Sequence, residues 1–474
     1  MSAGCTAALR GGILTLTLDT PGSSVNVFTP AIALELEREL ARGLAKGARA
    51  VVLRSAKPGS FVNGVGLLLA ASSHSREGAM ERARTLQRCY EALAAAPVPT
   101  IADIAGNCYG CGLELALTCD YRIAQDSYDT HFYMPELRDY AFIPLFGGTQ
   151  RLPRLLGLPQ AMRVLVGERI DAREALRIGL IDRIGEATAE MLAKKPRRTA
   201  KKRDGAVDLS VLPAPERPLA KEALRLARLT VRPGYRLQDG LRAELASFWE
   251  TVGSKESQRA MSFFFVRQAA KVHAIGSAAY QLPKRVAVRF DTSARPLERL
   301  VRARLPQARI AAGPLTIAQR PPGDGVDCAA YLPFQQEPVP PVELAVGEMP
   351  WPAGAPLFQL LEQAGFAPVV TRARGRFVSE RMLEAFRKAA PSPSALLQFG
   401  FRLPRPLERQ LAKARGKVEP AIDAVAQEAL RALDSGELQH PTQADLLAHL
   451  LLGFPVVHGG LLRYVKAGRP GVLR

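Results

Sequence analysis

Hydrophobic and polar positions near the start of the chain alternate between the period of a strand and that of a helix. Residues 13–18 (Ile-Leu-Thr-Leu-Thr-Leu) alternate in steps of two, which predicts a half-buried strand. A helix is predicted to begin at Thr29 and Pro30, since threonine is a good N-cap and proline suits the first helical position. The same pattern predicts a strand over 50–54, a helix over 79–95 and a strand over 98–105. Strands that alternate with helices favour an α/β core.

The most informative stretch is residues 106–120, Gly-Asn-Cys-Tyr-Gly-Cys-Gly-Leu-Glu-Leu-Ala-Leu-Thr-Cys-Asp. Three glycines in seven residues, followed by an apolar run, predict a tight loop that enters a helix. The first turn of a helix has free backbone N–H groups and the positive end of the dipole. Gly110 and Gly112 let a ligand approach these N–H groups, which then suit an oxygen that gains negative charge. Glu114 lies beside them, in the first turn.

A second carboxylate, Glu136, follows in the stretch 130–137. An oxyanion hole with two glutamates is what adding water across a double bond next to a carbonyl requires, because one carboxylate activates water and the other protonates the α-carbon. Each glutamate also has a simpler interpretation. Glu114 would merely complement the helix dipole, and Glu136 would be a solvated loop residue.

Several stretches together resemble a known family: residues 18–30, 52–64, 106–120, 147–157 and 167–182. They cover residues 10–185 almost continuously. The chain resembles the crotonase (enoyl-CoA hydratase/isomerase) superfamily and, more narrowly, the α-subunits of fatty-acid oxidation complexes. The resemblance implies an α/β fold with a crotonase-like ββα spiral in the N-terminal domain. It also implies a fatty acyl-CoA substrate and enoyl-CoA hydratase activity, with Δ3,Δ2-enoyl-CoA isomerase activity as an accompanying option.

The family's functional positions map onto this sequence one by one. Its two catalytic glutamates fall on Glu114 and Glu136, and its oxyanion-hole amides on Val65 and Cys111. Gly64, Gly110 and Gly112 fall in its substrate-binding loops. The family usually has Ala-Gly-Ala-Asp at 63–66 and three glycines at 110–112, whereas this chain has Asn-Gly-Val-Gly and Gly-Cys-Gly. Phe132 and Tyr133 replace a smaller Leu-Gly pair.

The second half resembles the family's NAD-dependent 3-hydroxyacyl-CoA dehydrogenase but lacks the residues that bind NAD and carry out the reaction. The segment 291–296 (Asp-Thr-Ser-Ala-Arg-Pro) replaces the glycine-rich turn that holds a pyrophosphate. By the resemblance, the catalytic histidine is Glu337 here and the catalytic asparagine is Glu380. Two glycines of the family are replaced here by Arg374 and Arg376. We therefore expect a truncated Rossmann-like remnant, no NAD binding and no cofactor.

Length and charge give the expected domain organisation. At 474 residues the chain should hold two or three domains. We expect a hydratase-like domain over 1–190, a basic linker with connecting helices over 191–280, the dehydrogenase remnant over 281–345, and a helical domain over 346–474. Residues 1–190 contain 20 basic and 20 acidic residues, so the net charge of +19 comes entirely from the remainder. The basic run at 194–203 is composed like a localisation signal, but a solvated linker is the preferred interpretation.

Other function classes receive little support from the sequence. The basic residues lack the aromatic or motif context of a nucleic-acid binder, so no nucleic-acid partner is expected; the charge could instead attract CoA phosphates, an acidic subunit or anionic lipid. Cys108 and Cys111 form a Cys-x-x-Cys pair without a second pair, and no metal site is expected. Scattered cysteines and the lack of a long apolar run predict a cytoplasmic protein without a transmembrane segment. A thiolase subunit or a second copy of the chain is the expected partner. The alternative to an enzyme is a non-catalytic subunit of an oxidation complex.

Overall fold

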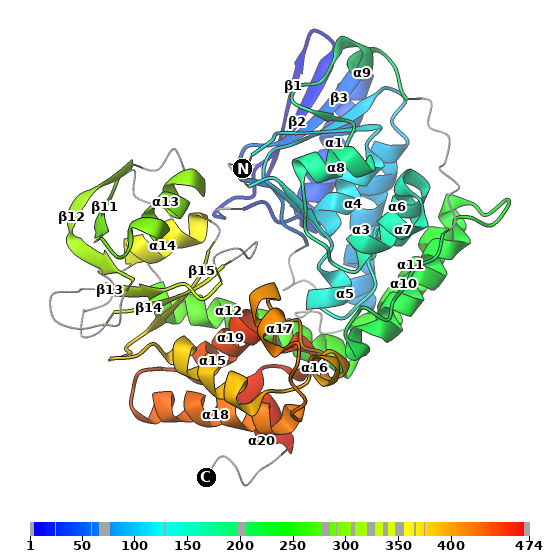
Figure 1. The fold of residues 1–474 in the computed structure, drawn as a ribbon. Coiled ribbons are helices and arrows are strands. Elements are labelled where there is room, and N and C mark those ends of the chain that lie inside the picture. Colours follow the sequence, from blue (N-terminus) through cyan, green and yellow to red (C-terminus); the bar gives the residue numbers. More distant parts are fainter. Residues whose placement is uncertain are drawn as a thin grey trace. The chain divides into compact units, whose positions relative to one another are not determined.

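The computed structural model describes residues 4–23, 25–57, 59–65, 76–127, 129–196, 205–275, 285–290, 292–304, 309–319, 328–334, 340–346, 355–364, 366–373 and 375–468. The chain divides into two compact units (Figure 1). The first comprises Met1–Leu209 and Glu216–Ser257, and the second Ser210–Pro215 and Gln258–Arg474. The first unit thus continues past residue 190 and includes helices that the sequence assigned to a linker. Among the described residues, no helix combines the length and apolar composition needed to cross a membrane.

Two sheets form the framework of the first unit. The larger has the order β1-β2-β3-β5-β7-β10, in which β1 is antiparallel to β2 and every other neighbouring pair is parallel. Its strands are β1 (Cys5–Arg10), β2 (Ile13–Leu18), β3 (Ala50–Ser55), β5 (Thr100–Ile104), β7 (Tyr121–Ala124) and β10 (Arg183–Ile184). The smaller has the order β4-β6-β8-β9, with strands β4 (Ser60–Val62), β6 (Asn107–Tyr109), β8 (His131–Tyr133) and β9 (Ile170–Asp171). The predicted α/β core is therefore confirmed.

Helices of the first unit bury their apolar faces against these sheets and against each other. The helix predicted from Thr29 is confirmed, because the Thr29 hydroxyl accepts a hydrogen bond from the amide of Ile32 at 3.3 Å and Pro30 is the first helical residue. The helices are α1 (Pro30–Ala45), α3 (Arg76–Ala94), α4 (Cys111–Thr118), α5 (Glu136–Asp139), α6 (Gly148–Leu156), α7 (Leu158–Leu165), α8 (Ala172–Ile178), α9 (Ala189–Ala193), α10 (Arg217–Leu229) and α11 (Leu237–Val252). One core cluster includes residues of α1, α3, α4, α6, α7 and α10, so the presumed linker helix α10 belongs to this core.

The second unit contains a five-stranded sheet with the strands in chain order: β11 (Arg285–Phe290), β12 (Arg309–Ala318), β13 (Cys328–Tyr331), β14 (Pro341–Ala345) and β15 (Ala367–Thr371). Only β13 and β14 pair antiparallel. A doubly wound dinucleotide-binding sheet has a switch point where the strand order reverses. The described strands have none, so the expected Rossmann-like remnant is not confirmed. The pairing of β14 with β15 also crosses the expected boundary at residue 345.

The second unit also contains many helices. Two of them, η1 (Ala214–Glu216) and α12 (Lys255–Ile275), lie partly in the first unit. The others are α13 (Arg295–Arg304), α14 (Ala355–Gln363), α15 (Val378–Ala389), α16 (Pro393–Phe399), α17 (Arg405–Leu411), α18 (Val418–Asp434), α19 (Pro441–Leu452), η2 (Val456–His458) and α20 (Leu461–Gly468). Glu380 lies on α15 and pairs with Arg376 at 3.1 Å. Glu337 and Arg374 lie outside the described residues. Buried Glu343 of β14 accepts the amides of Val378 and Ser379 and thereby holds the start of α15.

Candidate active site

Three adjacent parallel strands bring the predicted site residues to one edge of the smaller sheet. β4 pairs with β6 and β6 with β8, both in parallel. The carboxyl ends of parallel strands lie at the same edge, where the loops that follow them meet. Val65 follows β4, Cys111 follows β6 and Glu136 follows β8. The topology thus gathers residues that are widely separated in the sequence.

Glycines allow these loops to approach one another closely. Gly110 has a φ of 51°, and a side chain there would overlap the carboxyl group of Glu136. A side chain on Gly112 would overlap the carbonyl oxygen of Val62 at the end of β4. Gly64 has a φ of 104°, which favours glycine, and its carbonyl accepts the amide of Phe28 at 3.0 Å. The predicted tight loop before α4 agrees with the structure, whereas the role of these glycines in binding a substrate stays a prediction.

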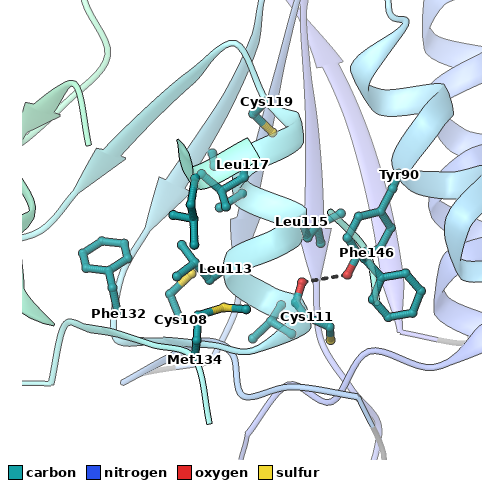
Figure 2. Packing of buried hydrophobic residues seen from close by; sticks show 14 of the residues in the cluster. Tyr90, Cys108, Cys111, Leu113, Leu115, Leu117, Cys119, Phe132, Met134 and Phe146 are labelled. Atoms are coloured by element: carbon teal, nitrogen blue, oxygen red, sulfur yellow. Dashed lines mark hydrogen bonds between the residues drawn. The ribbon is translucent and has the colours of Figure 1, made fainter. Parts of the chain in front are cut away.

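The first turn of α4 supplies the candidate oxyanion donors. Cys111 is the first residue of α4, and amides at this position have no acceptor within the helix. The hydroxyl of buried Tyr90 donates to the carbonyl oxygen of Cys111 at 2.7 Å, and the ring of Tyr90 stacks on Phe146 (Figure 2). These contacts fix the start of α4 from the side of α3. Val65, in the loop that follows β4, forms an isolated bridge with Phe28, and this bridge holds that loop.

Glu114 is buried in the first turn of α4, with 1% of its surface exposed. Its Oε1 accepts the amides of Phe146 and Gly148, each at 2.8 Å. Burial raises the pKa of Glu114 well above its ordinary value, and the charges of Glu244 and Glu136 raise it further. The two amides oppose this rise, because they stabilise the carboxylate anion. A buried carboxylate with a raised pKa is suited to proton transfer near neutral pH.

Glu136 is also buried, at the first position of the short helix α5. Its Oε2 is buried and has no hydrogen-bond partner among the described residues. Burial raises the pKa of Glu136 to about 8, and the charges of Asp139 and Glu244 add to the rise. A carboxyl oxygen without a donor is more stable in the protonated form. The interpretation of Glu136 as a solvated loop residue is therefore wrong.

A third buried glutamate, Glu244 of α11, was not predicted as a site residue. Its Oε1 accepts the amide of Gly147 at 2.6 Å, and its Oε2 accepts the amide of Thr149 at 2.8 Å and the Thr149 hydroxyl. Burial raises the pKa of Glu244 to about 7. Glu244 and Glu114 thus bind the same turn, although they come from different helices. The available sequence signal was a glutamate on the buried face of α11, four residues from both Gly240 and Phe248.

The Cys-x-x-Cys pair lies in the core of the first unit. Cys108 and Cys111 are free, buried thiols, and burial raises the pKa of both. A thiol with a raised pKa is a poor nucleophile and a poor metal ligand at neutral pH. Within the described ranges, no group of three or more His, Cys, Asp or Glu side chains could hold a metal ion.

The two larger residues on β8 have different environments. Phe132 is completely buried in the core of the first unit. The hydroxyl of Tyr133 donates to Asp139 at 2.7 Å, and its ring lies edge-on to Tyr109 at 5.6 Å. These bulky side chains are therefore held by contacts with neighbouring residues of the same unit.

Comparisons with known proteins show what the chain is similar to. Residues 9–208 match the family described as enoyl-CoA hydratase/isomerase. The chain is 31% identical over 283 residues to a fatty acid oxidation complex subunit alpha from Shewanella loihica, covering 54% of this chain and 40% of that protein. It is 36% identical over 169 residues to the Vibrio campbellii protein of the same name, covering 35% and 24%. An enoyl-CoA hydratase structure from Bacillus halodurans has 22% identity and a TM-score of 0.39, covering 54% of this chain and 98% of that one.

Residues 9–208 are thus similar to the enoyl-CoA hydratase/isomerase family, and the predicted resemblance is confirmed for this part of the chain. The chain spans less than half the length of the curated relatives that it matches. Glu114, Glu136, Val65 and Cys111 all lie within the matched residues, whereas Glu244 lies beyond them.

Proposed function

We propose that the first unit is an enoyl-CoA hydratase that adds water to a fatty enoyl-CoA thioester, with enoyl-CoA isomerisation as a related activity of the same groups. The observation that carries the proposal is the pair of buried glutamates, Glu114 and Glu136, beside the first turn of α4. The family match and the fatty acid oxidation relatives support the acyl-CoA substrate class.

In the proposed reaction, water adds at C3 and a proton adds at C2. Glu114 takes a proton from water as the oxygen bonds to C3, since two amides stabilise its ionised form. The electrons of the double bond move toward the thioester, whose oxygen becomes negatively charged between the amides of Val65 and Cys111. Glu136 then gives its proton to C2, which yields a 3-hydroxyacyl-CoA. The missing donor at Glu136 Oε2 supports this assignment of the proton.

For the second unit we propose a structural role without NAD chemistry. Glu380, at the position of the expected catalytic asparagine, pairs with arginine, and Glu343 is occupied by helix amides. A thiolase subunit or a second copy of the chain is the partner we propose for assembly, in the cytoplasm. The basic residues of this half suit an acidic partner surface.

The proposed function is tested with purified protein and trans-2-enoyl-CoA substrates of short and long chain length. Loss of the conjugated thioester absorbance measures hydration, and a parallel reaction contains NAD. We expect hydration without NADH formation. Failure to hydrate every chain length, by protein shown to be folded, would favour the non-catalytic subunit, which the bulk of Val65 and Cys111 in the oxyanion loops also favours. NADH formation from a 3-hydroxyacyl-CoA would contradict the structural role of the second unit.

The pH dependence provides a second prediction. The proposed proton donor must be protonated in the free enzyme, and the pKa of Glu136 is about 8. We therefore expect kcat/KM to fall as the pH rises through about 8, because the proton needed at C2 is lost. The measurement is kcat/KM between pH 6 and pH 10. A profile that stays level across this range would assign the proton to another group.

A further inference from the structure

The turn formed by residues 146–149 is held from two sides by carboxylates. Its four successive amides alternate between two acceptors. Phe146 and Gly148 donate to Glu114, whereas Gly147 and Thr149 donate to Glu244. Because neighbouring amides bind different carboxylates, the turn cannot shift on one side without changing the other. Glu244 therefore acts on Glu114 through shared backbone.

Further contacts anchor Glu244 to the body of the first unit. The Thr149 hydroxyl donates to Glu244 and accepts from Gln150 Nε2 at 3.1 Å. The same amide nitrogen also donates to the carbonyl oxygen of Leu226 on α10, at 3.1 Å. A side chain at Gly240 would overlap Gln150, so α11 lies directly against α6 at this point. Helices α10 and α11 therefore complete the support of the turn.

We propose that Glu244 is a positioning residue for the hydration reaction, which holds the 146–149 turn so that its amides fix Oε1 of Glu114. The proposal rests on the proposed function of the first unit. Glu244 lies beyond residues 9–208, the segment that matches the family. Glu244 acts through the turn rather than on the substrate, so its loss should lower kcat and leave KM unchanged.

The charge of Glu244 gives a readout that a purely mechanical support would not move. Its negative charge raises the pKa of Glu114 and that of Glu136. Removing this charge should therefore lower both pKa values. The ionisable groups that face Glu114 come from five elements: Glu244 of α11, Glu136 of α5, Arg151 of α6, Cys111 of α4 and Tyr90 of α3.

The experiment compares Glu244→Gln with Glu244→Asp, and uses Glu250→Gln as an exposed control on the same helix. Glutamine has one acceptor oxygen, so its amide group would face a backbone N–H. We expect Glu244→Gln to lower kcat by about 100-fold, because small displacements of a catalytic group have effects of this size. The low-pH limb of its pH profile, set by Glu114, and the high-pH limb, set by Glu136, should both move to lower pH. Glu244→Asp keeps the charge, so the limbs should stay in place. Its side chain is shorter and holds the turn less well, so kcat should fall.

A measurement independent of turnover separates this proposal from the proposed function. The carboxyl of Glu114 can be titrated by 13C NMR in protein labelled at glutamate, with its signal assigned by its loss in Glu114→Gln. A lower midpoint in Glu244→Gln would show that Glu244 acts on Glu114, and a wild-type protein that nevertheless hydrates no substrate would overturn the proposed function alone. An unchanged midpoint, or wild-type kcat in folded Glu244→Gln, would overturn it. If Glu244→Gln does not fold, wild-type kcat in Glu244→Asp would overturn it.

Discussion

Replacing Glu114 by glutamine is expected to lower kcat/KM for enoyl-CoA hydration by about 100- to 10,000-fold, the range for loss of a general acid or base. Glutamine keeps an oxygen that can accept the amides of Phe146 and Gly148, so the turn should stay in place. It cannot take a proton from water. The free energy of unfolding should not fall, because an uncharged side chain has less desolvation cost when buried.

The matched control for this variant is Glu35→Gln. Glu35 is also a buried glutamate of the first unit, and its Oε2 accepts the amide of Cys5 at 2.9 Å. It lies on α1, outside the site, so its replacement should leave kcat/KM close to the wild-type value. Hydration rates and denaturant unfolding curves check both variants. Wild-type turnover in Glu114→Gln would show that Glu114 serves only as an acceptor for the turn.

The parts of the fold that follow from local rules could be predicted from the sequence. The start of α1 depends on Thr29 and Pro30, which act within one turn of the helix. The loop before α4 depends on glycines that allow unusual φ values and close contacts. Glu114 was predicted because it stands within this local pattern, Glu136 was noted as a second carboxylate downstream of it, and the family resemblance then placed both at catalytic positions.

The parts that depend on distant contacts could not be predicted. Nothing in the residues near Glu244 indicates that it meets Gly147 and Thr149, because the contact arises from packing of α11 on α6. The strand order of the sheet in the second unit could not be predicted for the same reason. Its order is set by non-local strand pairing, such as that between β14 and β15 across α14, whereas sequence periodicity reports only single elements.

The second large effect is expected at Gly112, where the start of α4 lies against the end of β4. A β-carbon at this position would overlap the backbone carbonyl oxygen of Val62. Backbone cannot rotate away as a side chain can, so α4 and β4 would have to separate. Separation would move the amide of Cys111 relative to that of Val65. In the proposed reaction, both amides bind the thioester oxygen.

Gly112→Ala should therefore lower kcat by about 100- to 1,000-fold, the effect of losing one oxyanion-hole donor. It should also lower the free energy of unfolding by about 1–3 kcal/mol, as overpacking does in other cores. Gly253→Ala is the control, because Gly253 has a φ of −81° and its added carbon would meet its nearest neighbour at 3.8 Å. Enoyl-CoA turnover and urea unfolding measure both effects. Loss of stability with unchanged kcat would place the oxyanion hole away from α4, since the strain would then be present without a catalytic consequence.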